Sequence, residues 1–218
     1  MCGRFTLYSS LDDLKKVFAV GAVIGEMNPS YNIAPGNEIF AIIRQKENRM
    51  GNLHWGLVPP WAKNPSAVSG FINARAETLQ EKPSFQRAFQ KKRCLIPADG
   101  FYEWKEGQPW YCTPAAGKLF GFAGLWETWR GKNETVYHSC TIITAEAGES
   151  LREIHDRMPV ILTPESIEEW LNPDVAEYER LNAILRHGRV TGVKAYPVSR
   201  FVDSPKNNDP RCIQPVSA

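Results

Sequence analysis

The chain has 218 residues, of which 43% are hydrophobic and 23% charged, and this composition excludes disordered, coiled-coil and membrane-spanning classes. The formal net charge is only +2, so overall attraction to nucleic acid is small and phosphate binding requires a local basic cluster. Five cysteines at wide, irregular spacing, without a CxxC pair, argue against a disulfide framework and a zinc site. We therefore expect neither a metal nor a cofactor.

The N-terminal segment, Met1-Cys2-Gly3-Arg4-Phe5, is the first chemically suggestive feature. Aminopeptidases remove an initiator Met1 before a small residue, which would leave Cys2 with a free α-amine and a thiol on adjacent carbons. That amine has a pKa near ~7.7 to 8.0, against ~10.4 for lysine, so it is a nucleophile toward aldehydes, and the thiol can then close a five-membered ring on the imine. The alternative is a frayed terminus. In an extended segment Arg4 would lie on the same side as Cys2 and hold an anion beside it.

Element signals along the chain predict an α+β fold. Ser10 begins a capping motif before a short amphipathic helix, Thr163 caps a second helix opened by Pro164, and residues 172–187 form another helix that ends at Gly188. A short helix is also expected over residues 84–90. Residues 98–100 (Ala98-Asp99-Gly100) carry a hairpin signal. Strands are expected over residues 39–44, 53–57, 94–97, 101–105, 110–113, 119–126 and 136–144.

This order of elements favours a single domain over residues 1–218, with a mainly antiparallel sheet or partly closed barrel core and peripheral helices. The first twenty residues carry four charged side chains in one short stretch, and no run of 18 apolar residues occurs. We therefore expect neither a signal peptide nor a transmembrane helix, and a cytoplasmic protein.

Three polar clusters interrupt the strand pattern. Residues 73–77 place Asn73, Arg75 and Glu77 on alternate positions, which share one face if the segment is extended. Glu103 lies among large aromatic residues, where burial would raise its pKa into a range useful for proton transfer, although alternation alone does not decide which way it faces. His155 titrates near neutrality, and Arg157 can fork onto a phosphate. Each cluster has an alternative interpretation. Residues 73–77 could form a solvated sheet face, Glu103 could face outward, and His155 could be a structural or exposed histidine.

Two loops add exposed groups of the kind that wedge between or stack on nucleic-acid bases. Pro35 lies in Asn32-Ile33-Ala34-Pro35-Gly36, and Trp61 follows Val58-Pro59-Pro60. Taken singly, both are also ordinary loop residues.

Together these motifs resemble the SOS response-associated peptidase family, the abasic-site processing proteins, over nearly the whole chain. The resemblance is carried in order by residues 1–5, 32–36, 55–57, 73–77, 98–104 and 154–159, and continues to 197–199. It implies binding of single-stranded DNA containing abasic sites, including sites at replication-fork junctions, by a monomer in the bacterial cytosol or nucleoid. It also implies a thiazolidine crosslink between Cys2 and the ring-opened deoxyribose after Met1 removal, which the family achieves at least partly by self-processing. Weak lyase activity by β-elimination is an expected side reaction.

The resemblance further implies roles for individual residues. Asn73 would orient the Cys2 amine or thiol, Glu103 would carry protons and help release Met1, and His155 would protonate the sugar oxygen. Phosphates would be bound by Arg4, Arg75 and Arg157, and the kinked strand would be contacted by Pro35 and Trp61. Two alternatives remain open: an N-terminal nucleophile amidohydrolase or peptidase that uses Cys2, and a non-enzymatic single-strand binder.

Overall fold

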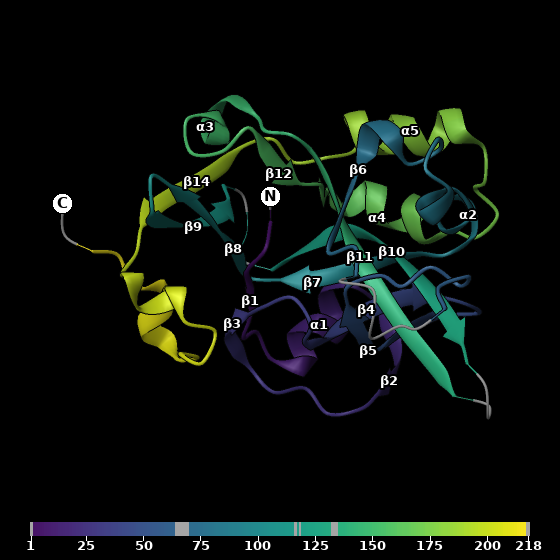
Figure 1. Cartoon of the computed structure of the whole chain (residues 1–218), viewed down its shortest axis with the longest axis horizontal. Coiled ribbons are helices and arrows are strands. Elements are labelled where there is room, and N and C mark those ends of the chain that lie inside the picture. The colour runs from purple at the N-terminus through teal and green to yellow at the C-terminus, as the bar shows by residue number, and fades with distance from the viewer. Residues whose placement is uncertain (1, 64–69, 116, 118, 132–134, 217–218) are drawn as a thin grey trace.

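A computed structural model describes residues 2–63, 70–115, 117, 119–131 and 135–216 (Figure 1). Its strands are β1 Phe5–Leu7, β2 Val20–Ile24, β3 Ser30–Ile33, β4 Glu38–Arg44, β5 Asn48–Trp55, β6 Asn73–Arg75, β7 Arg93–Ala98, β8 Gly100–Lys105, β9 Gln108–Pro114, β10 Phe120–Arg130, β11 Val136–Glu146, β12 Arg157–Pro159, β13 Ile161–Leu162 and β14 Val193–Pro197. The helices are α1 Leu11–Val17, α2 Pro83–Lys91, α3 Glu149–Arg152, α4 Pro164–Leu171 and α5 Tyr178–His187, with 3-10 turns η2 Ala76–Thr78, η4 Arg200–Asp203 and η5 Pro210–Ile213.

Five strands close into a barrel that forms the centre of the single domain. Their order is β7, β4, β5, β11 and β10, and β10 pairs again with β7. All of these pairs are antiparallel except β5 with β11, where Ser139 lies opposite His54. Large apolar side chains, Trp55 and Phe122 among them, are fully buried in the associated core. The predicted α+β class with a barrel-like sheet is therefore confirmed.

A second sheet, in the order β14-β9-β8-β1-β3, lies beside the barrel (Figure 1). Strand β8 is buried on both faces, because Phe101 joins the main core while Tyr102 joins a second cluster with Val198 and Val202. Residues of alternate parity on β8 therefore enter different apolar clusters. The N-terminal segment runs through the middle of Figure 1, between β8 and the barrel, and pairs with β8 through Phe5 opposite Phe101.

The predicted hairpin at residues 98–100 is wrong. Strands β7 and β8 join different sheets, since β7 pairs with β4 and β10 whereas β8 pairs with β1 and β9. Asp99 is buried and accepts hydrogen bonds from the backbone N–H groups of Tyr8 (2.6 Å) and Ser9 (2.8 Å) and from the Ser9 hydroxyl. These contacts with the N-terminal segment fix a crossover from the barrel to the second sheet in place of a turn.

The predicted helix starts are confirmed for the two helices that begin with a capping side chain. Ser10 accepts from the Asp13 N–H at the start of α1, and Thr163 does the same for Ser166 at α4. α2 Pro83–Lys91 covers the helix expected over residues 84–90. α5 ends before Gly188 as expected but begins at Tyr178, several residues after the predicted start.

The late start of α5 has a tertiary cause. The carbonyls of Asn172 and Val175 accept hydrogen bonds from the buried guanidinium of Arg93, at 2.6 and 2.8 Å. The Asn172 carbonyl also accepts the Val175 N–H at 3.2 Å, in a turn that precedes the helix. Within the described part of the chain, no helix is long and apolar enough to cross a membrane.

Candidate active site

Cys2 is fully buried at the junction of the two sheets and packs in the main core. Its backbone carbonyl accepts a hydrogen bond of 2.9 Å from Nδ2 of Asn73. The Asn73 Oδ1 atom is buried and has no hydrogen-bond partner among the described residues. A buried acceptor without a donor costs stability, so this oxygen is suited to receive a donor that arrives with substrate or with a change at the terminus.

Asn73 is positioned by β6, a short strand that pairs in parallel with β11, where Asn73 lies opposite Ile142. Asn73 and Arg75 share one face of β6, as alternation predicts. The extended segment ends at Arg75, however, and Glu77 lies in the 3-10 turn η2. The expectation that all three side chains follow one extended face therefore holds only for the first two.

Glu103 lies on β8 with 2% of its surface exposed, on the same face as Phe101 and hence toward the main core and Cys2. Burial raises the pKa of its carboxyl from 4.5 to about 7. At neutral pH the group is therefore divided between its acid and base forms, which suits it to carry protons in either direction. The alternative of an outward-facing, solvated glutamate is excluded.

His155 follows α3 and precedes β12, and its Nε2 lies 4.0 Å from Oε2 of Glu103. Its Nδ1 accepts a hydrogen bond from the Arg157 backbone N–H at 2.9 Å, which places the proton of the neutral ring on Nε2, facing Glu103. The same Nδ1 is 2.9 Å from Asp156 Oδ1, a contact that is favourable only when the ring is protonated. Burial lowers the pKa of His155, so the neutral tautomer with Nε2–H predominates at pH 7.

The Cys2 thiol is electrostatically linked to this pair. Burial, followed by the charge of Glu103, raises the pKa of Cys2 well above its usual value. The thiol is consequently protonated at neutral pH, and a neighbouring base must take its proton before the sulfur can attack. The four predicted catalytic residues thus come together in two contacts, Cys2 with Asn73 and Glu103 with His155, linked by the field of Glu103.

Arg4 lies on the other side of the N-terminal strand from Cys2. Its Nη1 donates to Asn32 Oδ1 (2.6 Å) and to the Val202 carbonyl (2.8 Å), and its guanidinium lies 5.8 Å from the Trp104 ring centre. These partners place it against the second cluster, whereas Cys2 packs in the main core. The predicted shared side for Arg4 and Cys2 is therefore not observed, and both residues precede strand β1, which begins at Phe5.

Arg157 forms a two-pronged ion pair with Glu77, in which both Nη–Oε distances are 2.9 Å. Its Nη2 also donates to the Thr144 carbonyl at 2.8 Å. Burial alone would raise the pKa of Glu77, but the hydrogen bonds from Arg157 and from the backbone, together with the charges of Arg157 and Arg75, outweigh burial and lower it. In this structure the Arg157 guanidinium, which the sequence analysis assigns to phosphate binding, is bound to the Glu77 carboxylate instead.

Arg75 is exposed and makes no hydrogen bond or ion pair with any described residue. Pro35 and Gly36 form the exposed tip of a type II turn, since Gly36 has φ +85° and the Asn37 N–H donates to the Ala34 carbonyl. Trp61 has 59% of its surface exposed. These three predicted DNA-contact residues are accessible, in contrast to Arg4 and Arg157.

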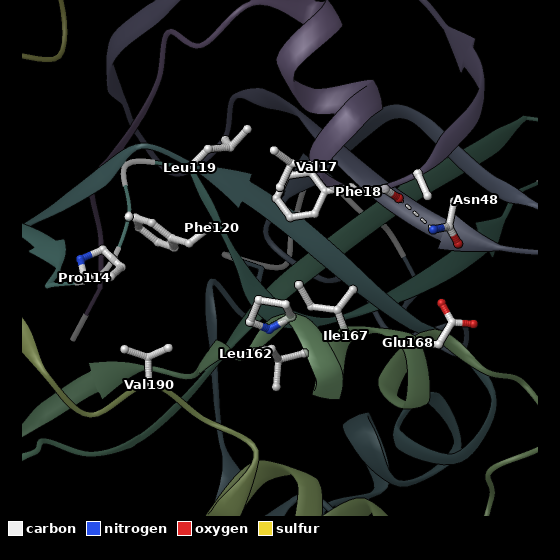
Figure 2. A pocket seen from close by; sticks show the side chains of 13 residues that line it. Val17, Phe18, Asn48, Pro114, Leu119, Phe120, Leu162, Ile167, Glu168 and Val190 are labelled. Carbon is white, nitrogen blue, oxygen red and sulfur yellow. Dashed lines mark hydrogen bonds between the residues drawn. The ribbon is translucent and has the colours of Figure 1, made fainter.

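An apolar cavity of about 250 Å³ lies elsewhere, between α1, α4 and the start of β10 (Figure 2). Its polar members are already engaged, because Asn48 donates to the Phe18 carbonyl and Glu168 pairs with Arg44. None of the four predicted catalytic residues is among the described residues that line this cavity. No group of three metal-ligating side chains occurs in the part of the chain that the structure describes.

Two further residues at this site escaped sequence reasoning, Trp110 and Cys112 on β9. Trp110 lies directly opposite Glu103 and Cys112 opposite Phe101, so both share the face of Glu103. The charge of Glu103 also contributes, after burial, to the raised pKa of Cys112. The alternation of side chains along the two strands could have indicated these residues, but only if the residue pairing between the strands had been known.

Comparison with known proteins places the chain in a family. The family model described as SOS response associated peptidase (SRAP) matches residues 1–205. The chain belongs to the SRAP family. It is 47% identical over 222 residues to abasic site processing protein YoqW of Bacillus subtilis, covering 98% of this chain and 99% of that protein. It is also 32% identical over 228 residues to abasic site processing protein YedK of Escherichia coli, with 99% and 100% covered.

Solved structures share this fold. A crystal structure of a protein from Bacteroides thetaiotaomicron superimposes with a TM-score of 0.88 at 26% identity, covering 99% of this chain and 100% of that one. A phage-related protein from Bordetella bronchiseptica gives a TM-score of 0.72 at 31% identity, with 90% and 94% covered. The fold of this chain is therefore similar to that of both solved structures.

Proposed function

We propose that this SRAP-family protein processes abasic sites in single-stranded DNA by forming a covalent thiazolidine crosslink through Cys2 after Met1 is removed. The observation that carries the proposal is the placement of Cys2 beside Asn73 and within the field of Glu103, whose pKa lies near 7. The names of the bacterial relatives, abasic site processing proteins, supply the substrate class. Met1 itself lies outside the described residues.

The chemistry begins with the amine. In the proposed sequence the Cys2 α-amine adds to the C1′ aldehyde of the ring-opened deoxyribose, and loss of water gives an imine. The thiol then adds to the imine carbon, so that a carbon–sulfur bond forms and the thiol proton passes to the nitrogen. Net addition of the DNA with loss of one water leaves a five-membered ring.

Glu103 and His155 serve the proton transfers in this sequence. The lesion sugar is mostly a closed ring, and the Nε2–H of neutral His155 is the donor that protonates the sugar oxygen as the ring opens. Glu103 takes a proton from the attacking group and, being about half ionised at pH 7, returns it to the departing hydroxyl. The buried Cys2 thiol needs the same base, because its raised pKa keeps it protonated.

Asn73 orients the nucleophile by two opposed contacts. Its Nδ2 already holds the Cys2 carbonyl, and its Oδ1 has no partner among the described residues. In the proposal, removal of Met1 creates the missing donor, since the α-amine of Cys2 can then donate to this oxygen. Hydrolysis of the Met1–Cys2 bond is assigned to Glu103 as the base that activates water.

The imine also acidifies C2′, so strand cleavage by β-elimination competes with ring closure and accounts for a weak lyase activity. We assign phosphate contacts to Arg75, which is exposed and unpaired among the described residues, and to Arg157 once Glu77 releases it. Arg4 instead supports the N-terminal strand through its bonds to Asn32 and Val202. Exposed Pro35 and Trp61 are assigned to the strand beside the lesion.

Intact mass spectrometry tests the proposal in one experiment. The protein is weighed before and after incubation with an oligonucleotide that contains one abasic site, with the intact oligonucleotide as control. We expect loss of one methionine residue, followed by gain of the oligonucleotide mass less water on the abasic strand alone. An equal, non-covalent affinity for both strands would leave only a single-strand binder, and ammonia release from glutamine-like amides would indicate an N-terminal amidohydrolase.

A further inference from the structure

The indole Nε1–H of Trp110 is buried and has no hydrogen-bond partner among the described residues. A buried donor left without an acceptor destabilises the fold, and a buried tryptophan normally donates its N–H to a partner. Trp104 on the adjacent strand β8 shows the ordinary case, because its Nε1 donates to Asp203 Oδ1 at 2.9 Å. The open donor on Trp110 therefore needs an acceptor that this state does not present to it.

Glu103 is the acceptor nearest in register. Trp110 on β9 lies directly opposite Glu103 on β8, so the two side chains leave the sheet on the same face with Cβ atoms about 4.5–5.5 Å apart. Both side chains face the main core, where Trp110 packs against the buried cluster. Trp104 on the same strand as Glu103 faces the opposite cluster.

Several ionisable groups face Glu103 from the elements packed against it. Cys2 comes from the N-terminal segment, Cys112 from β9, and His155 and Asp156 from the α3–β12 connection. The N-terminal amine favours ionisation of Glu103 by its charge and by a hydrogen bond, whereas the Asp156 charge opposes it. The two thiols are weak donors, and His155 Nε2 lies 4.0 Å from Oε2 of Glu103. An indole N–H can only donate and does not titrate, so a hydrogen bond from it favours the ionised carboxylate and lowers the pKa of the carboxyl group.

We propose that the Trp110 indole N–H donates a hydrogen bond to the Glu103 carboxylate whenever that group is ionised, and thereby sets the pH range in which Glu103 acts as a base. Trp110 is then a positioning residue that acts through Glu103. Protonation of Glu103 weakens its oxygens as acceptors without removing them, so the hydrogen bond is strongest to the ionised form. The inference rests on the proposed function only for its consequence in catalysis, since the hydrogen bond itself concerns the free protein.

The direct test is a pH titration of the wild-type protein by NMR, with ¹⁵N-labelled tryptophan and ¹³C-carboxyl-labelled glutamate. The Trp110 indole signal is assigned with Trp110→Phe, and the carboxyl signal with Glu103→Gln. We expect the Trp110 indole proton to move downfield as pH rises, with the same midpoint as the Glu103 carboxyl signal. This measurement needs no folded variant beyond those used for assignment, and the DNA is absent.

The variant test removes the N–H but keeps an aromatic ring. Trp110→Phe should raise the midpoint of Glu103 by about one pH unit, as expected for loss of one hydrogen bond to a charged acceptor, and the low-pH limb of the crosslinking rate should shift equally. Trp104→Phe is the matched control, because its N–H is bound to Asp203 on the other face, and its Glu103 midpoint should be unchanged.

The outcomes separate the two proposals. An indole signal of Trp110 that does not follow Glu103, or an unchanged Glu103 midpoint in a folded Trp110→Phe variant, overturns the hydrogen bond. If the hydrogen bond is present but the wild type forms no crosslink with abasic DNA, the inference stands and the proposed function fails. If the wild type forms the crosslink but the Trp110 indole signal does not change with pH, the proposed function stands and the hydrogen bond is overturned.

Discussion

Replacing Glu103 by Gln should make the protein more stable at pH 8 and far less active. Glu103 has 2% of its surface exposed, and its pKa rises from 4.5 to about 7 because burial penalises the charged form. The native state therefore binds this proton more tightly than the unfolded chain. The stability conferred by the proton is complete below about pH 4.5 and is lost as the pH rises through 7.

The size of the effect follows from the shift. A change from 4.5 to about 7 corresponds to about 3 kcal/mol of unfolding free energy lost by the wild type between acid and alkaline pH. Gln keeps the shape and carries no charge, so E103Q should recover up to this amount at pH 8 and nothing near pH 4.5. The midpoint of thermal unfolding should rise by roughly 6–12 °C at pH 8. The crosslinking rate should fall by about 10²–10⁴.

Glu127 provides the matched control, since it is also 2% exposed but pairs with Lys92 and accepts the Thr128 N–H at 2.9 Å. E127Q should lose about 1–3 kcal/mol at pH 8 and keep its crosslinking rate, so the two substitutions differ in the sign of their effect. Urea unfolding at pH 5 and pH 8 measures both. If E103Q were no more stable than the wild type at pH 8, hydrogen bonds to the carboxylate would outweigh its desolvation, and the reasoning would be refuted.

Three further predictions concern the nucleophile and the basic residues. Cys2→Ala, with its α-amine free, should lose the heat-stable adduct but retain an imine that borohydride traps, as seen on denaturing gels. Arg75→Ala should reduce the salt slope of binding to intact single strands by about 0.7, because Arg75 is exposed and has no hydrogen-bond or ion-pair partner among the described residues. Arg4→Gln should leave the slope unchanged and lower thermal stability, because Arg4 is bound to Asn32 and to the Val202 carbonyl. Glu77→Gln should tighten strand binding by about two- to fivefold in fluorescence anisotropy, because it weakens the ion pair that occupies Arg157.

The sequence predicted the fold well where the determinants are local. The Ser10 and Thr163 caps act within three residues, so the starts of α1 and α4 could be predicted from them. The hairpin at residues 98–100 could not be rejected in this way, since the partners of Asp99 are Tyr8 and Ser9, about ninety positions earlier. The same limit explains the α5 start, which depends on Arg93 binding carbonyls that lie far along the chain.

The candidate site divides in the same way. The aromatic residues around Glu103 indicated a raised pKa, but the sequence did not show which face of β8 the side chain lies on. Both faces of β8 are buried, and the two faces differ only in the apolar cluster that each one contacts. The ion pair of Arg157 with Glu77 joins residues 80 positions apart, so no local pattern could show that the fork is occupied. Trp110 became visible only through the register of β9 with β8.

The protonation states at the site favour an order of events in the proposed reaction. A Cys2 thiol with its pKa raised by burial is a poor first nucleophile at neutral pH, whereas an α-amine with a pKa near ~8 is partly free base. Attack by the amine first produces water and an imine, and only then is the thiol needed. At that stage the ionised form of Glu103 is the base that accepts the thiol proton as the carbon–sulfur bond forms, because the thiol loses its affinity for the proton only when sulfur bonds to carbon. The neutral ring of His155 beside it adds no positive charge that would oppose imine formation. While Met1 remains, the Cys2 nitrogen is part of a peptide bond, so Cys2 cannot form the imine on which the proposed ring closure depends.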